Sequence, residues 1–191
     1  FDAFWADTLR DAGRVPLNVV VTAVPMRSTD LVEAFEVHYD SYKGLRIAGW
    51  YCRPRGGGGH PGLLLVPGYV GEPELPKGWA ARGYAAFSVA PRGKLRSNAD
   101  FNPGYPGLLT QNMHDRDSYG YRGFYMDALR AFDFLAGLPE VHSGRIGVLG
   151  SSQGGALALL VSSLRAGSVK AASAGAPYLC SMMDAASLTR S

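Results

Sequence analysis

Residues 145–155 read RIGVLGSSQGG, a short apolar run that passes through a glycine-rich turn into an alanine- and leucine-rich segment. The turn fits the pattern G-x-S-x-G, with Ser152 at its centre. Chance matches to this pattern are common, but a buried strand before it and a helix after it form the setting that a nucleophile turn requires. Such a turn is sharp and strained, and it presents the serine hydroxyl at the carboxyl end of the sheet. We therefore predict that Ser152 is a catalytic nucleophile.

The residues around Ser152 have the sizes that this turn needs. Strand and helix pack closely there, so the positions two before and two after the serine must be small, and they are Gly150 and Gly154. The N–H of Gln153 begins the helix and is predicted to point at a developing oxyanion, where one donor is worth about 3 kcal/mol. The other interpretations are a glycine-rich turn without catalysis and a phosphate-binding loop. No lysine follows in the position of a P-loop, which disfavours the second of these.

A second oxyanion donor is expected in the loop after an earlier strand. The run 62–66 is continuously apolar, as in a strand buried on both faces, and residues 67–71 (PGYVG) follow it. We predict that the N–H of Tyr69 is this donor. The alternative is an ordinary loop with Tyr69 packed on the surface.

The pattern on either side of these motifs predicts an α/β fold. From residue 62 onward strands and helices alternate, which is typical of a parallel sheet with helices on both faces. The preceding runs alternate in hydrophobicity around a short glycine-containing loop and predict an antiparallel hairpin. We expect one domain over residues 1–191. The predicted strands are 17–24, 34–39, 45–52, 62–66, 84–90, 145–149 and 169–174; the helices are 1–13, one ending near 83, 119–138 and 153–164; a long polar loop spans 92–118.

The amino-acid composition and the net charge restrict the kinds of partner that the chain is expected to bind. Apolar residues make up 47% of the chain and charged residues 18%, and the net charge of +3 is too small to indicate a nucleic-acid partner. No apolar run approaches the roughly 18 residues of a membrane span. The basic residues Arg92, Lys94 and Arg96 share one loop, and by themselves they suggest a solvated surface turn.

The two cysteines, Cys52 and Cys180, have no metal-type spacing. We predict two free thiols in a reducing compartment, with a disulfide as the alternative, and a cytoplasmic protein. The chain opens at Phe1 and not at a methionine, which leaves a signal peptide open.

The partners of a catalytic serine are harder to find. In this fold the acid and then the histidine follow the serine, whereas all four histidines here precede Ser152: His38, His60, His114 and His142. Of these, His114 lies in the long loop and is the one expected to be able to approach the site. The one carboxylate after Ser152, Asp184, is expected to cap a helix or lie on the surface. We therefore expect the acid- and histidine-bearing C-terminal part of the fold to lie outside this sequence.

Several ordered motifs together resemble one family. They are the opening FDAFW (1–5), IAGWY (47–51), Pro91-Arg92-Gly93, the tyrosine- and arginine-bearing segment 119–130, the turn 150–155, and APYLC (176–180). In these motifs the chain resembles the acetyl xylan esterase / cephalosporin C deacetylase family of carbohydrate esterases.

The resemblance implies an α/β-hydrolase that removes acetyl groups from small acetylated sugars and cephalosporin-type esters without a metal or other cofactor. It implies Ser152 as nucleophile, Gln153 and Tyr69 as oxyanion donors, and Arg92 with Gly93 as a structural motif near the site. It also implies a homo-oligomer, often a hexamer.

Three features depart from the family pattern. Members are longer, Lys94 stands where their motif has Gln, and Pro67 stands where they usually have His. Proline has no N–H to donate, but the donor expected here is Tyr69. Two other functions stay open: another branch of the same fold, such as a dienelactone-hydrolase-like enzyme or a peptidase, and a truncated, catalytically dead relative that serves as a binding module.

Overall fold

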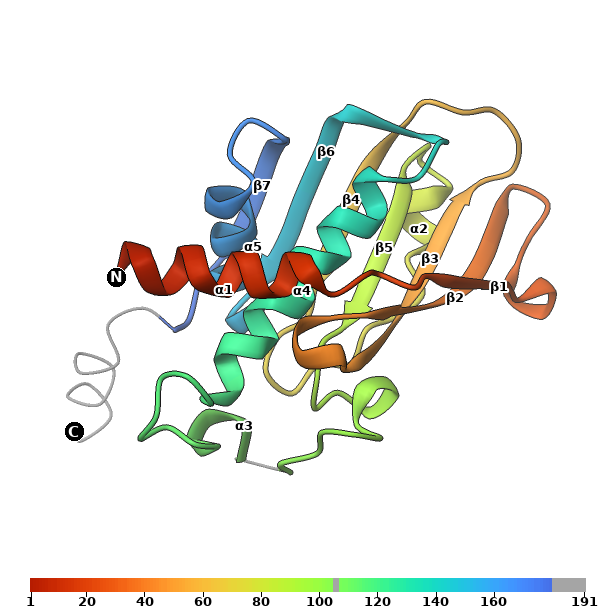
Figure 1. Cartoon of the computed structure of the whole chain (residues 1–191). Helices are drawn as coiled ribbons and strands as arrows, with labels where there is room; N and C mark the ends of the chain where they lie inside the picture. The colour runs from red at the N-terminus through yellow and green to blue at the C-terminus, as the bar shows by residue number, and fades with distance from the viewer. Residues whose placement is uncertain (105–106, 180–191) are drawn as a thin grey trace.

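The computed structural model describes residues 1–104 and 107–179, and it is built on one mixed sheet (Figure 1). In the described residues this sheet has seven strands in the order β1-β2-β3-β5-β4-β6-β7. The strands are β1 (Val20–Ala23), β2 (Val32–Asp40), β3 (Arg46–Pro54), β4 (His60–Val66), β5 (Ala85–Ala90), β6 (Val141–Ser151) and β7 (Val169–Gly175).

The pairing confirms the predicted division of the sheet. β4 pairs in parallel with both β5 and β6, and β6 pairs in parallel with β7. β1, β2 and β3 form an antiparallel unit, and β3 joins the parallel part through an antiparallel pairing with β5. Every residue of β5 is buried, which agrees with its sequence, apolar except for Ser88. By contrast, β1 is fully exposed and shorter than the predicted strand 17–24, because it is the edge of the sheet.

Helices cover both faces of the sheet, as predicted. They are α1 (Asp2–Arg14), α2 (Lys77–Ala80), α3 (Gly107–Thr110), α4 (Gly120–Ala136) and α5 (Gln153–Leu164), with short 3-10 segments η1 (Pro25–Arg27), η2 (Tyr42–Gly44) and η3 (Leu95–Ser97). Figure 1 shows α1, α4 and α5 on one side and α2 behind the strands. The predicted loop 92–118 is therefore partly ordered by η3 and α3.

The hydrophobic core has two parts, one for each face. The larger one joins α4 to the sheet, with Phe124 and Phe132 among its buried residues, and Phe87 of β5 against Phe134 of α4 with ring centroids 4.8 Å apart. The smaller one lies under α2 and consists of Val32, Ala34, Cys52 and Ala80. Since α4 bears the larger core, its position is fixed by burial over most of its length.

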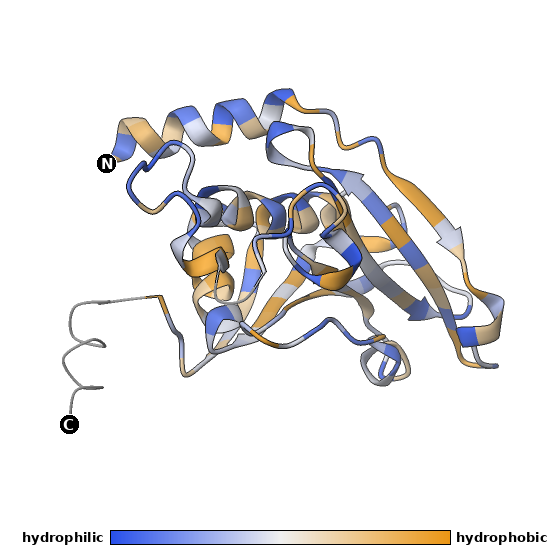
Figure 2. Cartoon of the chain, turned by 90° about the horizontal axis from the view of Figure 1, so that it is seen from below, coloured by the Kyte–Doolittle hydropathy of each residue, from blue (hydrophilic) through white to orange (hydrophobic). Residues whose placement is uncertain are grey.

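The helix α1 lies against α4 and not against the sheet. Trp5 packs on Tyr125 with ring centroids 6.1 Å apart, and Arg122 Nε donates to Thr8 Oγ1 at 2.9 Å. Hydrophilic and hydrophobic residues alternate along α1 (Figure 2), in keeping with its predicted amphipathic pattern.

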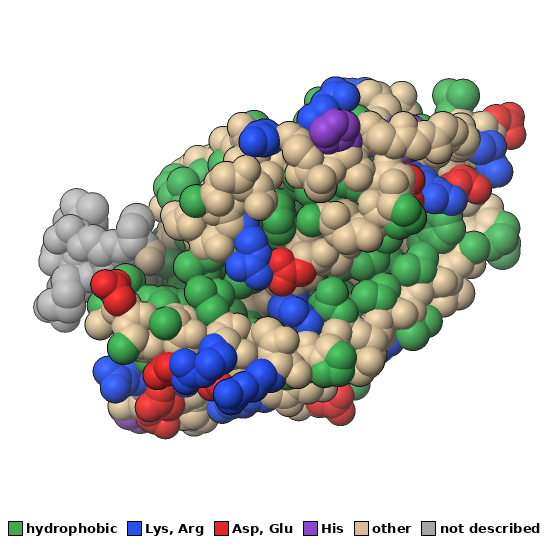
Figure 3. Space-filling view, turned by 45° about the horizontal axis from the view of Figure 1, so that its top comes forward, with side chains coloured by type: hydrophobic (Ala, Val, Ile, Leu, Met, Phe, Trp, Pro, Cys, Tyr) green, Lys and Arg blue, Asp and Glu red, His purple; other side chains and the backbone are tan. Residues whose placement is uncertain are grey.

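Three further sequence expectations have a bearing here. Among the described residues, no helix combines the length and the hydrophobicity needed to cross a bilayer. Cys52 is a free, buried thiol whose pKa is raised by burial to about 11, whereas Cys180 lies outside the described residues. On the face in Figure 3, lysine and arginine side chains lie interspersed with acidic ones, so that face carries mixed charge.

Candidate active site

Ser152 is the single residue between β6 and α5. β6 ends at Ser151 and α5 begins at Gln153. The serine has φ 56° and ψ −122°, a conformation that residues other than glycine rarely adopt, and its side chain is exposed. Its N–H donates to Gly175 O at 2.8 Å, and its own carbonyl accepts the N–H of Tyr178 at 3.0 Å. The backbone strain is thus held by β7 and the segment that follows it.

The glycines of the turn lie where three chain segments meet. A Cβ on Gly150 would lie 2.7 Å from Val66 Cγ2 of β4, and one on Gly154 would overlap the carbonyl oxygen of Val66. A Cβ on Gly155 would lie 2.8 Å from Gly175 O. Real Cβ atoms do not approach other atoms this closely without displacing them, so the turn, β4 and β7 require glycine here.

Gln153 begins α5 and is completely buried. As the first residue of a helix it has an N–H without an intrahelical acceptor, at the positive end of the helix dipole. Its side-chain Nε2 donates to Tyr121 Oη of α4 at 3.2 Å. Burial raises the pKa of Tyr121, so that this hydroxyl stays protonated. The contact of Tyr121 with Gln153 was not predictable from the sequence, because a tyrosine on an apolar helix stripe carries no signal beyond core packing.

The loop after β4, residues 67–72, lies beside the nucleophile turn; we call it the oxyanion loop. A Cβ on Gly68 would be 3.6 Å from Ser151 O, so the two backbones are in contact there. Tyr69 packs against the main core. Both predicted donors, the N–H groups of Gln153 and Tyr69, therefore belong to segments that meet at the carboxyl edge of the sheet, the side from which Figure 2 is viewed.

The basic loop 92–97 is not a solvated turn, and that expectation was wrong for Arg92 and Lys94, which are only 5% and 4% exposed. Arg92 forms two parallel hydrogen bonds to Asp127 of α4, Nε to Oδ2 at 2.8 Å and Nη2 to Oδ1 at 2.9 Å. Gly123, one turn before Asp127, leaves the space that the guanidinium fills. Gly93 has φ +83°, which only glycine adopts readily. The motif thus fixes the loop to α4.

Asp127 was not among the residues predicted for the site, although its position in the sequence carries a signal. It lies on the otherwise apolar face of α4 and is completely buried. A buried carboxylate needs a charged or hydrogen-bonding partner, so a carboxylate on an apolar stripe predicts a basic residue elsewhere in the chain. It accepts the backbone N–H of Arg92 as well, at 2.9 Å.

Lys94 connects this loop to the oxyanion loop. Its Nζ donates to Gly68 O at 2.9 Å and to Tyr69 O at 2.5 Å. In return, the carboxylate of Glu72 accepts the N–H of Leu95, at 3.2 Å from the nearer oxygen. Burial lowers the pKa of Lys94, and the charge of Glu72 opposes that shift. The departure from the family motif at position 94 therefore has a definite structural role.

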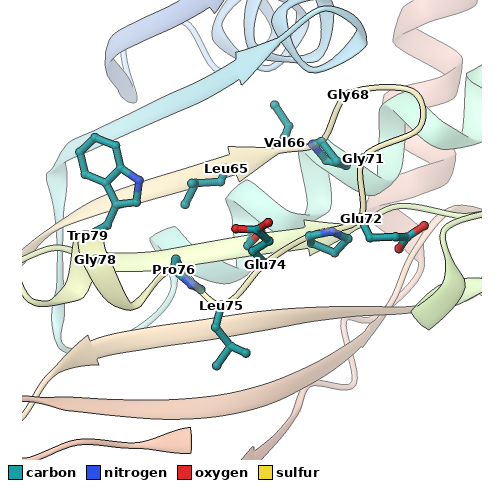
Figure 4. A pocket seen from close by; sticks show the side chains of 13 residues that line it. Leu65, Val66, Gly68, Gly71, Glu72, Glu74, Leu75, Pro76, Gly78 and Trp79 are labelled. Atoms are coloured by element: carbon teal, nitrogen blue, oxygen red, sulfur yellow. The ribbon is translucent and has the colours of Figure 1, made fainter.

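Two cavities flank the oxyanion loop. One of about 300 Å³ lies between this loop, β4 and α2, with Leu65, Glu74 and Trp79 in its lining (Figure 4). Figure 4 shows Gly68 and Gly71 at the end of β4. The other, of about 270 Å³, lies on the side of Tyr69 and Lys94. Ser152 lines neither cavity; both are lined by residues of the oxyanion loop.

Three of the four histidines lie on strands, away from the carboxyl end of β6 that bears Ser152. His60 and His142 stand at the amino ends of β4 and β6, the latter ten residues or about 30 Å of strand before the serine. His38 lies in β2 opposite Ala48 of β3. His114 is exposed in the turn after α3. Within the described part of the chain no hydrogen bond joins a histidine to Ser152. Asp184 lies outside that part.

Comparison with known proteins identifies the family of this chain. The acetyl xylan esterase (AXE1) family matches residues 1–191, the whole chain. The chain belongs to the acetyl xylan esterase family. The acetyl esterase Axe7A of Xylanibacter ruminicola is 29% identical over 179 residues, covering 86% of this chain and 40% of that protein. The resemblance seen in the sequence motifs is confirmed.

Solved structures agree. An acetyl xylan esterase from Paenibacillus sp. R4 superposes with a TM-score of 0.91 at 33% identity, covering 100% of this chain and 63% of that one. Acetyl xylan esterase 1 from Thermoanaerobacterium sp. JW/SL YS485 superposes with a TM-score of 0.87 at 22% identity, covering 98% and 61%. The α/β-hydrolase fold is thereby confirmed. The chain spans less than two thirds of the length of these acetyl xylan esterase relatives.

Proposed function

We propose that this chain carries the nucleophile of a serine carboxylesterase that removes acetyl groups from small acetylated sugars, such as acetylated xylo-oligosaccharides, and from cephalosporin-type acetyl esters. The observation that supports it most is Ser152 itself, strained at φ 56° and exposed between β6 and α5. Its surroundings match a nucleophile turn in every glycine, and the family consists of proteins named for acetyl ester cleavage.

In the proposed mechanism Ser152 Oγ attacks the acetyl carbonyl while a histidine takes the hydroxyl proton. The N–H groups of Gln153 and Tyr69 donate to the oxyanion of the tetrahedral intermediate. When the intermediate collapses, the C–O bond to the sugar breaks and the histidine gives its proton to the leaving oxygen. Water then attacks the acetyl-serine, acetate leaves and the serine is restored. In this proposal the histidine and the acid that orients it come from outside residues 1–191. No metal or other cofactor takes part.

We further propose that the protein forms a homo-oligomer, a hexamer on the family pattern, in the cytoplasm. A closed assembly restricts the site to small substrates. Light scattering after size exclusion measures the oligomer directly, and a monomer at working concentration contradicts this part of the proposal.

The test is acetate release from p-nitrophenyl acetate and from acetylated xylo-oligosaccharide by the protein in its full natural length. Ser152→Ala is expected to lower kcat by about 10⁶-fold, as removal of a catalytic serine does in other serine hydrolases. Ser151→Ala is the matched control, since it removes a neighbouring exposed hydroxyl and is expected to retain most of the activity.

The other outcomes separate the alternatives. Cleavage of acyl-peptide bonds without acetyl ester cleavage would favour a peptidase branch of the fold. A folded wild-type protein that is as inert as Ser152→Ala would favour a binding module. Equal activity of Ser152→Ala and wild type would remove Ser152 from the mechanism.

A further inference from the structure

One peptide group connects Lys94 to the proposed oxyanion hole. The carbonyl of Gly68 and the N–H of Tyr69 belong to the same planar unit, and in a trans peptide they point in opposite directions. Lys94 Nζ lies 2.9 Å from that carbonyl oxygen. A group that fixes the carbonyl therefore also fixes the direction of the N–H on the other side.

We propose that Lys94 is a positioning residue for the reaction: its ammonium orients the Gly68–Tyr69 peptide and polarises it, so that the Tyr69 N–H becomes a stronger donor to the oxyanion. The inference rests on the proposed function, since it assumes that this N–H faces the reacting carbonyl. Hydrogen bonds from a charged donor are roughly twice as strong as neutral ones, and each bond in a chain strengthens the next.

Hydrogen bonds hold the backbone turn that bears Lys94 in place. The turn is closed by Lys94 N–H to Pro91 O at 3.1 Å and by Ser97 N–H to Lys94 O at 2.7 Å. Ser97 Oγ in turn accepts the N–H of Ala48 at 2.8 Å and donates to Ala90 O at 2.5 Å. The turn is thus tied to β3 and to the end of β5, and Lys94 reaches the oxyanion loop from a rigid base.

The charge of Lys94 is directed at carbonyl groups and not at a carboxylate. In residues 1–104 and 107–179, no carboxylate oxygen lies within the 4.0 Å of an ion pair with its Nζ. Glu72 acts on the pKa of Lys94 through its charge, while its oxygens accept the Leu95 N–H. The positive charge of the ammonium therefore acts mainly on the two carbonyl groups that it contacts, those of Gly68 and Tyr69. A glutamine at position 94 would be one bond shorter and uncharged, so it would orient less and polarise less.

Kinetics of three variants test the proposal: Lys94→Met, Lys94→Gln and, as a matched control, Lys170→Met. Lys170 also donates to a backbone carbonyl, Gly167 O at 3.3 Å, but it stands at the amino end of β7, at the opposite edge of the sheet. Loss of a whole oxyanion donor costs about 10²–10³ in kcat, so weakening one donor is expected to lower kcat by about 10- to 100-fold in Lys94→Met.

The division between kcat and KM separates positioning from a general loss of structure. Loss of an interaction that is made only in the transition state lowers kcat and kcat/KM equally, so KM is expected to stay nearly constant in Lys94→Met. Lys94→Gln is expected to lie between Lys94→Met and wild type, and it serves where Lys94→Met does not fold. The affinity of a boronic acid that forms a tetrahedral adduct on Ser152 is expected to fall in parallel with kcat/KM.

A readout without turnover isolates this inference from the proposed function. With selective ¹⁵N-tyrosine labelling, the Tyr69 amide resonance is assigned by Tyr69→Phe and followed in the variants. Lys94→Met is expected to shift its proton upfield, and Lys170→Met to leave it in place. An unshifted resonance, or wild-type kcat in both Lys94 variants while Ser152→Ala is inert, overturns the role of Lys94 and leaves the serine mechanism standing. Inert wild type with a shifted resonance overturns the serine mechanism and, with it, the role of Lys94 in the reaction; the polarisation of the Gly68–Tyr69 peptide by Lys94 is then all that stands.

Discussion

Replacement of Asp127 by asparagine tests whether the motif around Arg92 holds the site in place by a buried ion pair. The side chains of Arg92 and Asp127 are 5% and 0% exposed, and the guanidinium and the Arg92 backbone donate three hydrogen bonds to one carboxylate. Asparagine has nearly the same shape but no charge. The substitution therefore leaves a buried guanidinium without its counter-charge.

The expected loss follows from that burial. Removing one partner of a buried pair costs about 3–5 kcal/mol in the free energy of unfolding. For a domain of this size, each kcal/mol lowers Tm by about 2–4 °C, so the variant is expected to melt about 6–20 °C lower. Urea unfolding with a common m value gives the free energy, and a thermal melt gives Tm.

The chain contains its own control in Asp133→Asn. Asp133 accepts the same two-bond fork from Arg165, Nε at 2.8 Å and Nη2 at 2.9 Å, but there the side chains are 23% and 28% exposed. Fully exposed pairs contribute about 0.2–1 kcal/mol, and this pair lies between that limit and the buried Arg92–Asp127 pair, so Asp133→Asn is expected to cost less than Asp127→Asn. Equal destabilisation by Asp127→Asn and Asp133→Asn would refute the reasoning, because geometry alone, without burial, would then set the cost.

Two further substitutions test the turn and the acid stability of the sheet. Gly154→Ala places a Cβ on the carbonyl oxygen of Val66, the residue directly before the oxyanion loop. The resulting displacement of that loop is expected to lower kcat by about 10²-fold, and steady-state kinetics with unchanged kcat would contradict this. Burial by itself would raise the pKa of Glu140, but its hydrogen bonds, including those from Tyr51 and Arg53, outweigh burial and lower it. A carboxyl group whose pKa is lower in the folded than in the unfolded protein stabilises the fold at pH values above the unfolded pKa, and this stability is lost as pH falls through the folded pKa. Below about pH 5 the Tm of the wild type is therefore expected to drop more steeply than that of Glu140→Gln. Parallel curves of Tm against pH would exclude this role.

Local features were predictable because they depend on consecutive residues. The strand–turn–helix unit around Ser152 is set by an apolar run, two glycines and an alanine- and leucine-rich helix within about twenty residues, and the structure has β6, the turn and α5 there. The antiparallel hairpin of β2 and β3 follows in the same way from alternation around a short loop.

Contacts between distant residues were not predictable. Lys94 and Gly68 are 26 residues apart, Gln153 and Tyr121 are 32 apart, and Arg92 and Asp127 are 35 apart. By sequence alone the basic loop suggested a solvated turn, since charge usually faces water. The burial of Arg92 in this loop depends on Asp127, which lies in α4, further along the sequence.

The sequence by itself determined the α/β class and the strand–turn–helix setting of Ser152, because periodicity and glycine spacing act over one or two turns of chain. The family was indicated separately, by the resemblance of several ordered motifs. Only the tertiary structure decided that Arg92 and Lys94 are buried, and that Lys94 donates hydrogen bonds to the oxyanion loop. The physical reason is the strand order β5-β4-β6: it places the loops after β5 and β4 side by side at the carboxyl edge, where a charge leaves water because a carboxylate and backbone carbonyls from elsewhere in the chain replace its hydration.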